Sequence, residues 1–293
     1  MGFREDCLCC LGRHEWKFGH FHILNRCPLA EHAQQAELER IRGVSLNDKE
    51  KIKTDIIKLF ELHQAGKLGG EKMPEDENPC LDIHSRENYL YFTLPMALNY
   101  QRNSYKLWEG AKQTWQDKAT VDCFYPEIVA KMPIDDLREC LLKFKVAIQP
   151  NKQPVIWKTI CTTIHEQFDN DIRNLFIQEE FSINNIKQRI NDNKTSFPYL
   201  SGKKILNYWL YVMEQYTDVI FVDREHITVA PDTHIIQASC KLGIINESEK
   251  TLPNIQDIVS ERWQDILSDM GYCPIDIHTP LWLWSRGKFE IVI

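Results

Sequence analysis

Hydrophobic positions along most of the chain recur at the three- and four-residue spacing of amphipathic helices. In the N-terminal part, this spacing predicts a charged helix at Ala30–Arg42 and an amphipathic helix at Leu46–Ala65. The stretch Gly66–Asn78 is rich in Gly, Pro and charged residues, which is typical of a linker. We therefore expect an N-terminal extension over residues 1–80 and a helical body over residues 81–293.

Nearly all of the helical body is predicted to be helical. They are expected at Asn88–Tyr100, Leu107–Thr114, Pro133–Lys145, Pro154–Phe168, Asp169–Glu179, Ile183–Asn191, Lys203–Tyr216, Thr233–Leu242, Ile255–Met270 and His278–Trp284. Strand signals are confined to Asp218–Thr228, which leaves room for one small β-hairpin. The expected fold class is therefore all-α, with two helical subdomains around a cleft.

The composition supports a packed globular protein, because 43% of the residues are hydrophobic and 11% are aromatic. No apolar run approaches membrane-spanning length, and the first residues lack the charged-then-apolar order of a secretory signal. We expect an intracellular monomer, in the cytoplasm, nucleoid or nucleus, with no membrane partner. Without an export signal, the ten cysteines are interpreted as reduced thiols.

Zinc-ligand residue types gather near the N-terminus. They are Cys7, Cys9, Cys10, His14, His20, His22 and Cys27. Their spacing is not a C-x-x-C pair followed by a second pair, so a segment without metal is the favoured interpretation and a structural zinc is the alternative. No cofactor is expected to be required.

The net charge limits the choice of partners. The chain carries 35 Lys and Arg against 42 Asp and Glu, a formal charge of −7. Neutralising many phosphates needs a local excess of cations, so a broad polyphosphate-binding surface is disfavoured. A local basic strip beside a cleft remains compatible with this charge, and so does a small nucleoside or nucleotide substrate.

Candidate chemistry begins in the segment Phe197–Met213. A Pro and a Gly frame a short turn, and Lys203 and Lys204 occupy the first turn of the helix that follows. Two cations in succession at this end oppose the helix dipole, at a cost of a few tenths of a kcal/mol to about 1 kcal/mol unless another group compensates. The same field favours a neutral amine, which is a nucleophile. The alternative is a pair of solvated surface lysines.

A second candidate segment is Thr228–Gly243. Pro231 ends one element, and Asp232 is placed at the N-cap of the next. An Asp in this position has an ordinary explanation, because its carboxylate accepts a backbone N–H of the first helical turn. A catalytic carboxylate is the other interpretation.

Three motifs, taken in order, resemble the helix-hairpin-helix DNA glycosylases, which include endonuclease III and the 8-oxoguanine glycosylases. They are KILNY (Lys204–Tyr208), PDTHI (Pro231–Ile235) and DIHTPLWLWSR (Asp276–Arg286). The archaeal 8-oxoguanine glycosylase branch is the most similar, over about Asn88 to Arg286. The resemblance implies a helix-hairpin-helix motif, damaged double-stranded DNA as partner, and a DNA N-glycosylase with AP-lyase activity in base excision repair, acting on a damaged purine such as 8-oxoguanine.

The resemblance also implies roles for individual residues. The Schiff-base lysine falls on Lys204, or on Lys203 if the hairpin is shifted by one residue, and the essential carboxylate falls on Asp232. The base is expected to lie between the aromatic rings of Tyr208 and Trp282.

Further residues are expected at the edges of the same site. Trp108 matches another tryptophan near the base, and Gln101 matches an amide that contacts a base edge or the opened strand. The backbone N–H groups of Ser201, Gly202 and Lys203 are expected to hold a DNA phosphate.

The chain also departs from the family pattern. His278 stands where the archaeal branch has an acidic residue, which leaves the base that it would contact open. The hairpin Tyr199–Gly202 lacks the usual first glycine. Endonuclease III has a four-cysteine iron–sulfur motif, which is absent here because Cys273 stands alone after Cys240.

In the implied mechanism, the target nucleotide is extruded from the duplex before its base is gripped. Asp232 stabilises positive charge developing on the sugar, while Lys204 attacks C1′, expels the base and forms an imine that permits β-elimination.

Two other functions are compatible with the sequence. One is an N-glycosidase acting on a free modified nucleotide, similar to the queuosine-nucleotide hydrolases, which the net acidity favours. The other is a helical binding module without catalysis. Among the remaining signals, the acidic strip Glu75–Glu77 is interpreted as a solvated loop, and Trp284 and Phe289 as core packing.

Overall fold

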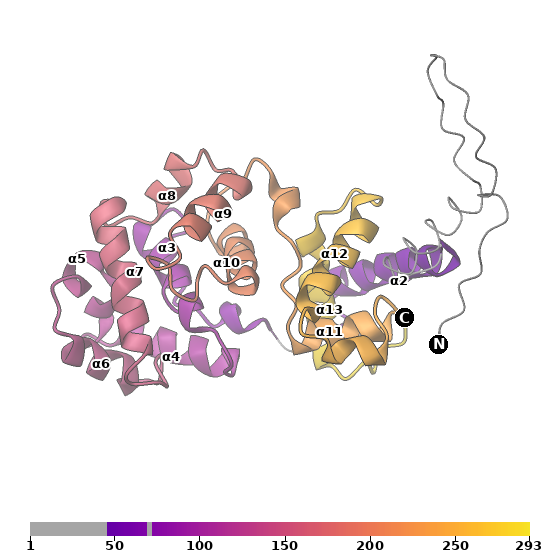
Figure 1. Cartoon of the computed structure of the whole chain (residues 1–293). Coiled ribbons are helices and arrows are strands. Elements are labelled where there is room, and N and C mark those ends of the chain that lie inside the picture. Colours follow the sequence, from indigo (N-terminus) through magenta and orange to yellow (C-terminus); the bar gives the residue numbers. More distant parts are fainter. Residues whose placement is uncertain (1–45, 69–71) are drawn as a thin grey trace, which may run out of the picture. The chain divides into compact units, whose positions relative to one another are not determined.

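The computed structural model describes residues 46–68 and 72–293, and these residues form helices joined by turns and loops, with no strand (Figure 1). The all-α class predicted from the sequence is confirmed. The α-helices are α2 (Leu46–Gln64), α3 (Arg86–Thr93), α4 (Ser104–Gln116), α5 (Pro126–Val129), α6 (Ile134–Lys143), α7 (Gln153–Gln167), α8 (Arg173–Gln178), α9 (Ile183–Asp192), α10 (Lys203–Tyr216), α11 (Thr233–Lys241), α12 (Ile255–Ser268) and α13 (His278–Arg286). Short 3₁₀ turns are η2 (Pro74–Asp76), η3 (Met96–Leu98), η4 (Val121–Phe124), η5 (Arg224–His226), η6 (Glu247–Thr251) and η7 (Pro274–Ile277).

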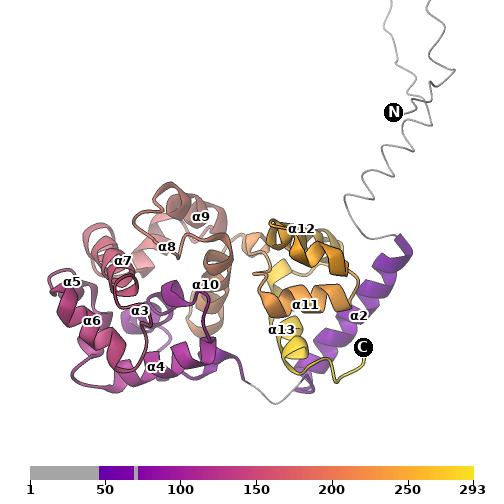
Figure 2. The same ribbon diagram turned by 60° about the horizontal axis from the view of Figure 1, so that its bottom comes forward.

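The helices are divided between two hydrophobic cores (Figures 1 and 2). The larger core is built from α3 to α10, and the smaller one from α2 together with α11, α12 and α13. Ile52, Ile56 and Leu59 of α2 are buried in the smaller core beside α13. The described N-terminal helix thus belongs to the same compact unit, Gly43–Ile293, as the rest, whereas the sequence pattern favours a boundary near residue 80.

The predicted helix Asn88–Tyr100 is interrupted. It ends at Thr93, and η3 follows after Pro95, which cannot donate the backbone N–H that a continuing helix needs. The chain then enters a loop in which Gln101 has a φ of +49°. This interruption is important for the site, because the loop forms part of a cavity wall.

The β-hairpin predicted at Asp218–Thr228 is wrong. The segment runs through the 3₁₀ turn η5 and pairs with no strand among the described residues. Its side chains nevertheless alternate between buried and exposed positions. Ile220 and Val222 are 82% and 72% exposed, and the N–H of Val222 donates to the carbonyl of Phe181 at 3.1 Å. A period of two therefore arose here from an extended loop lying on the core.

Helices α9 and α10 are joined by a segment that ends in a tight turn at residues 199–202, called the hairpin turn below. The turn between them is closed by the N–H of Ser201 donating to Phe197 O at 2.9 Å and that of Gly202 donating to Tyr199 O at 3.0 Å. A Cβ at Gly202 would lie only 3.1 Å from Tyr199 O, so a glycine suits this position. The turn sets the direction of α10 and of the lysines in its first turn.

Two predictions fall outside the described residues: the helix at Ala30–Arg42 and the zinc alternative at the N-terminus. Within the described ranges, no three or more His, Cys, Asp and Glu side chains are grouped as a metal site. No helix there is long and apolar enough to cross a membrane.

Candidate active site

A cavity of about 510 Å³ lies between the two cores, within the size range of small-molecule pockets. Its walls come from η2, from the loop before α4, and from α10, α11, α12 and α13. Six of the residues predicted to act on a substrate line it, namely Gln101, Lys204, Tyr208, Asp232, His278 and Trp282. The amine, the carboxylate and the aromatic rings that the sequence singles out therefore meet in one place.

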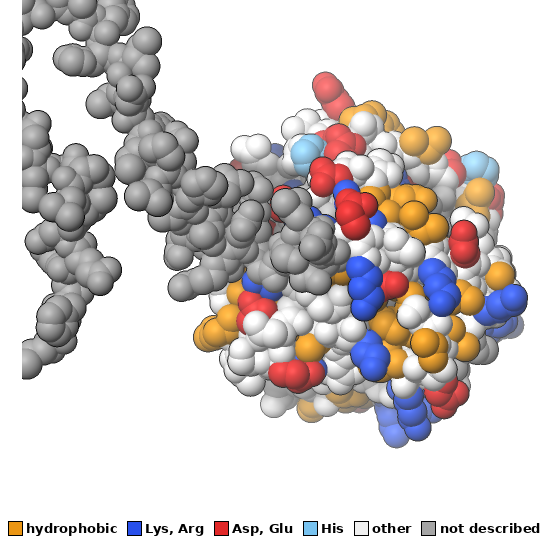
Figure 3. Space-filling view, turned by 90° about the vertical axis from the view of Figure 1, so that its right-hand side faces the viewer, with side chains coloured by type: hydrophobic (Ala, Val, Ile, Leu, Met, Phe, Trp, Pro, Cys, Tyr) orange, Lys and Arg blue, Asp and Glu red, His pale blue; other side chains and the backbone are white. Residues whose placement is uncertain are grey.

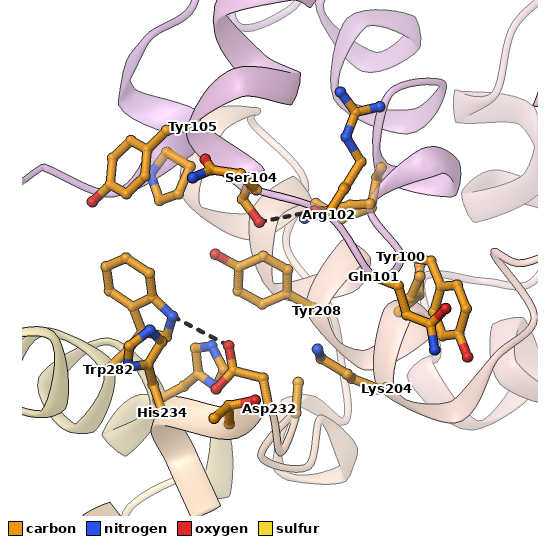
Figure 4. Close-up of a pocket in the computed structure, with 18 of the residues that line it drawn as sticks. Tyr100, Gln101, Arg102, Ser104, Tyr105, Lys204, Tyr208, Asp232, His234 and Trp282 are labelled. Carbon is orange, nitrogen blue, oxygen red and sulfur yellow. Dashed lines mark hydrogen bonds between the residues drawn. The ribbon is translucent and has the colours of Figure 1, made fainter. Parts of the chain in front are cut away.

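The two adjacent lysines have different surroundings. Lys204 is half-buried and lines the cavity, and its amino group extends towards Asp232 and Tyr208 (Figure 4). It forms no ion pair with a carboxylate of the described residues. Lys203 is exposed, and its ammonium pairs with Asp257 of α12, which compensates a cation at the start of α10. Of the two candidate lysines, Lys204 is thus the one whose amine extends into the cavity without a carboxylate partner among the described residues.

Asp232 is an N-cap residue and also lines the cavity, so its position is compatible with both of the roles considered for it. It is the N-cap of α11, and its Oδ1 accepts the backbone N–H of Ile235 at 2.9 Å. Its other oxygen, Oδ2, accepts the indole N–H of Trp282 at 3.2 Å (Figure 4). One oxygen therefore holds the helix start and the second is oriented by an aromatic residue of the cavity wall, which fixes the carboxylate relative to Lys204.

Aromatic rings enclose the space around these two groups. Tyr208 comes from α10 and Trp282 from α13, so the rings belong to different cores. The ring of His234 lies 5.3 Å from that of Trp282 at 65°, and the ring of Tyr105 lies 6.1 Å from it. Flat aromatic faces of this kind suit a planar nucleobase.

His278 introduces a neutral imidazole into the cavity wall. It is 3% exposed, and its ring lies 5.0 Å from that of Tyr208. Burial is the main reason that its pKa is lowered to about 4; the charge of Asp232 acts in the opposite direction and that of Lys204 in the same one. Its Nδ1 is buried without a hydrogen-bond partner in the described part of the chain. An unpaired buried nitrogen costs about 1–3 kcal/mol, so a ligand group is its natural partner.

The largest difference from the sequence-based site is Glu75, which was expected to be solvated and is 1% exposed. Its Oε1 accepts the indole N–H of Trp108 at 2.9 Å, and its Oε2 accepts the hydroxyl of Tyr208 at 3.1 Å. Burial raises the pKa of Glu75 to about 7, although its hydrogen bonds oppose the shift. Pro74, immediately before it, lines the cavity. The sequence does not indicate this burial, because Glu75 is one of three consecutive acidic residues in a segment whose composition is typical of a linker.

Trp108 does not have the position predicted for it. It is fully buried among the aromatic rings of the larger core, and it does not line the cavity. Trp108, which was predicted to lie near the base, therefore cannot contact a ligand in the cavity directly, and its indole N–H donates to Glu75, which contacts Tyr208 of the cavity wall.

Two of the three backbone N–H groups that were predicted to hold a DNA phosphate are already hydrogen-bonded within the protein. The N–H groups of Ser201 and Gly202 are used inside the hairpin turn, and neither residue lines the cavity. The N–H groups of the first turn of α10, which starts at Lys203, have no partner within the helix. An anion would therefore be held by the start of α10, not by the turn itself.

Gln101 lies at the rim of the cavity, where its backbone is strained. Its φ of +49° is uncommon for a residue with a side chain, and it is exposed. Its neighbour Tyr100 stacks on Tyr199 of the hairpin, with ring centroids 5.4 Å apart and planes 24° apart. The loop and the hairpin are thereby held together beside Lys204 (Figure 4).

The far end of the cavity contains residues that the sequence did not identify. The guanidinium of Arg286 lies 5.7 Å from the ring centroid of Tyr105, and both residues line the cavity with His234. The hydroxyl of Tyr105 donates to the carbonyl of Lys72 at 2.7 Å. His234 and Arg286 are within the motifs that carry the family resemblance, but the sequence analysis assigned no role to either residue.

A scan against models of known protein families gives no match for this sequence, and a search of curated proteins gives none either. The geometry of the cavity therefore carries the functional argument.

Proposed function

We propose that this protein is a DNA N-glycosylase with AP-lyase activity, acting on a damaged purine such as 8-oxoguanine. One observation supports this above all others: the Lys204 amine and the Asp232 carboxylate line the same cavity, between the rings of Tyr208 and Trp282. A glycosidic bond broken by an amine needs a nucleophile, an anion beside the sugar and a binding place for the departing base.

In the proposed reaction, a nucleotide leaves the duplex and its base enters between the two rings. The amine of Lys204 attacks C1′, the bond from C1′ to the base breaks, and the base leaves with that electron pair. Asp232 stabilises the positive charge that develops on the sugar and accepts the amine proton. The C1′–O4′ bond then breaks, O4′ takes back the proton from Asp232, and the aminal becomes an imine. The imine acidifies C2′, and loss of a C2′ proton expels the 3′ phosphate by β-elimination.

The charge of the protein is compatible with a small DNA footprint. Although the net charge is −7, acidic residues do not cover the surface uniformly. Figure 3 shows Lys and Arg side chains interspersed with hydrophobic ones over part of the face that carries the smaller core. The N–H groups at the start of α10 would hold a few phosphates beside the cavity, with a correspondingly weak dependence of binding on salt.

Borohydride trapping tests the proposal, because the reagent reduces a lysine imine to a stable covalent adduct. Duplexes carrying 8-oxoguanine or an abasic site are incubated with the wild type, Lys204→Ala and Lys203→Ala. We expect the adduct with the wild type and Lys203→Ala, and its loss with Lys204→Ala. The two variants remove the same side chain from adjacent positions, so charge and helix propensity are matched. No adduct with the wild type, or an adduct that depends on Lys203, contradicts the proposal.

The acidity of the chain favours one further candidate, an N-glycosidase acting on a free modified nucleotide. Such an enzyme releases a base from the free nucleotide without any trapped adduct. Absence of base release from either substrate would leave a helical binding module as the remaining interpretation.

A further inference from the structure

We infer that Glu75 is a positioning residue for the cavity, which sets the direction of the Tyr208 hydroxyl and so makes substrate binding depend on pH. The kinetic part of this inference rests on the proposed function, whereas the behaviour of the carboxyl group itself does not. The geometry that supports it is the chain of contacts from Trp108 through Glu75 to Tyr208.

The chemistry of the two partners restricts where a proton can reside on Glu75. An indole N–H can only donate, so the oxygen that faces Trp108 must remain an acceptor in every state. A proton taken up by Glu75 therefore belongs on Oε2, the oxygen 3.1 Å from the Tyr208 hydroxyl. Because a phenol can donate or accept, protonation reverses the direction of that second hydrogen bond.

The reversal changes what Tyr208 offers to a ligand. When Glu75 is ionised, the Tyr208 hydroxyl donates to it, and the phenol oxygen is left as an acceptor. When Glu75 is protonated, it donates to that oxygen, and the phenol O–H is free to donate elsewhere. Tyr208 lines the cavity and its hydroxyl is directed towards the space beside Tyr105 and Trp282 (Figure 4). The cavity wall thus presents an acceptor in one state and a donor in the other.

Glu75 is the group in this neighbourhood that changes its charge near neutrality. Burial raises its pKa to about 7. Burial also raises the pKa of each neighbouring phenol, so those side chains stay neutral at pH 6–8. The groups that face Glu75 are Asp76 and Glu77 from its own segment, Tyr91 from α3, Lys112 from α4, which pairs with Glu77, and Tyr208 and Tyr216 from α10.

The ionised state holds the ring of Tyr208 more firmly, because the hydrogen bonds that Tyr208 and Trp108 donate to Glu75 then end on a charged acceptor. We therefore expect substrate binding to improve as pH rises through about 7. A gain of one charge-assisted hydrogen bond predicts a decrease in KM of about fivefold between pH 6 and pH 8, with kcat nearly constant.

The kinetic test compares pH profiles of KM for the wild type, Glu75→Gln and Tyr208→Phe. Glutamine keeps the volume and the acceptor for Trp108 but cannot ionise, and phenylalanine removes the hydroxyl. Both variants should lose the step near pH 7. Tyr216→Phe is the matched control, because its hydroxyl donates to Asp76 in the same short helix at 2.8 Å, and it should retain the step. A step that persists in Glu75→Gln, or is absent in the wild type, overturns the inference.

A second measurement needs no activity. Infrared difference spectra of the ligand-free protein, with and without Glu75→Gln, report the C=O stretch of a protonated carboxyl group. We expect one such band to disappear near pH 7 in the wild type only. If the band titrates but no base is released, the proposed function fails while the Glu75 network stands. If the band does not titrate between pH 6 and pH 8, the Glu75 inference fails whatever the enzyme does.

Discussion

The two sides of the cavity fix their functional groups in different ways. On the side of α10, Lys204 and Tyr208 extend from a helix of the larger core, and a buried acid anchors the Tyr208 hydroxyl. On the side of α11 and α13, Asp232 is anchored by a helix cap and by Trp282, without a second titratable group in that hydrogen-bond chain. The first arrangement is sensitive to pH near neutrality, while the second depends on backbone geometry.

This difference indicates which changes separate catalysis from folding. Asp232 has two oxygens with two tasks, so its charge can be removed while its cap is kept. Glu75 has one buried carboxyl group whose charge and hydrogen bonds are inseparable except through an isosteric amide. The predictions below use these properties to test each side on its own.

The largest effect is expected at Asp232. Asp232→Asn preserves an N-cap acceptor but removes the negative charge beside the sugar, so the single-turnover excision rate should fall by about 10²–10⁴-fold. Asp232→Ala should lose a similar factor in rate and, in addition, about 1 kcal/mol of the free energy of unfolding, measured in urea. An Asn variant that excises at the wild-type rate would show that Asp232 is only a cap.

The second prediction concerns the stability that Glu75 confers at different pH. Burial raises the pKa of its carboxyl from an ordinary 4.5 to about 7, so the folded protein binds this proton more tightly than the unfolded chain. The free energy of unfolding should therefore fall by about 3 kcal/mol as pH rises from about 4.5 through 7. Urea titrations of Glu75→Gln should lack this component. Equal pH dependence in both proteins would contradict the buried position of the carboxyl group.

A smaller effect is expected when Trp282 is replaced by Phe. The ring and its stacking surface remain, but Asp232 loses the N–H that orients its Oδ2, so the excision rate should fall by about tenfold. Trp263→Phe is the control from the same core. Its indole N–H donates to Ser239 at 2.8 Å away from the cavity, so it should lower stability and leave the rate unchanged.

The smallest effect is expected at Lys203. Its ion pair with Asp257 is formed between side chains that are 63% and 50% exposed. Exposed pairs contribute little, and the lysine opposes the dipole of α10, so Lys203→Ala should change the free energy of unfolding by less than about 0.5 kcal/mol. Thermal unfolding measures this directly. A loss above 2 kcal/mol would assign Lys203 a structural role that its exposure does not explain.

Much of the fold could be predicted because its signals are local. The limits of α10 follow from the Pro and Gly of the preceding turn and from a clear helical period, and Asp232 is recognisable as a cap. The same local signals brought Lys204 and Asp232 forward as candidates, and the structure places both in one cavity.

What could not be predicted depends on contacts between distant segments. Nothing around Glu75 distinguishes it from a solvated acid, because its burial is created by Trp108 and Tyr208 from other helices. The position of Trp108 behind the cavity, not in it, has the same origin. The alternation at Asp218–Thr228 resembled a strand because one face of an extended loop rests on the core.

The cavity has a consequence for how the protein matures. Its walls include Pro74, near the start of the larger core, and Arg286 of α13, so segments far apart in the sequence form it. During synthesis, α10 and its amine emerge well before α13 supplies the opposite wall. A nascent chain is therefore expected to lack the complete cavity, because the wall that carries Lys204 meets the one that carries Trp282 only after nearly all of the polypeptide has been synthesised.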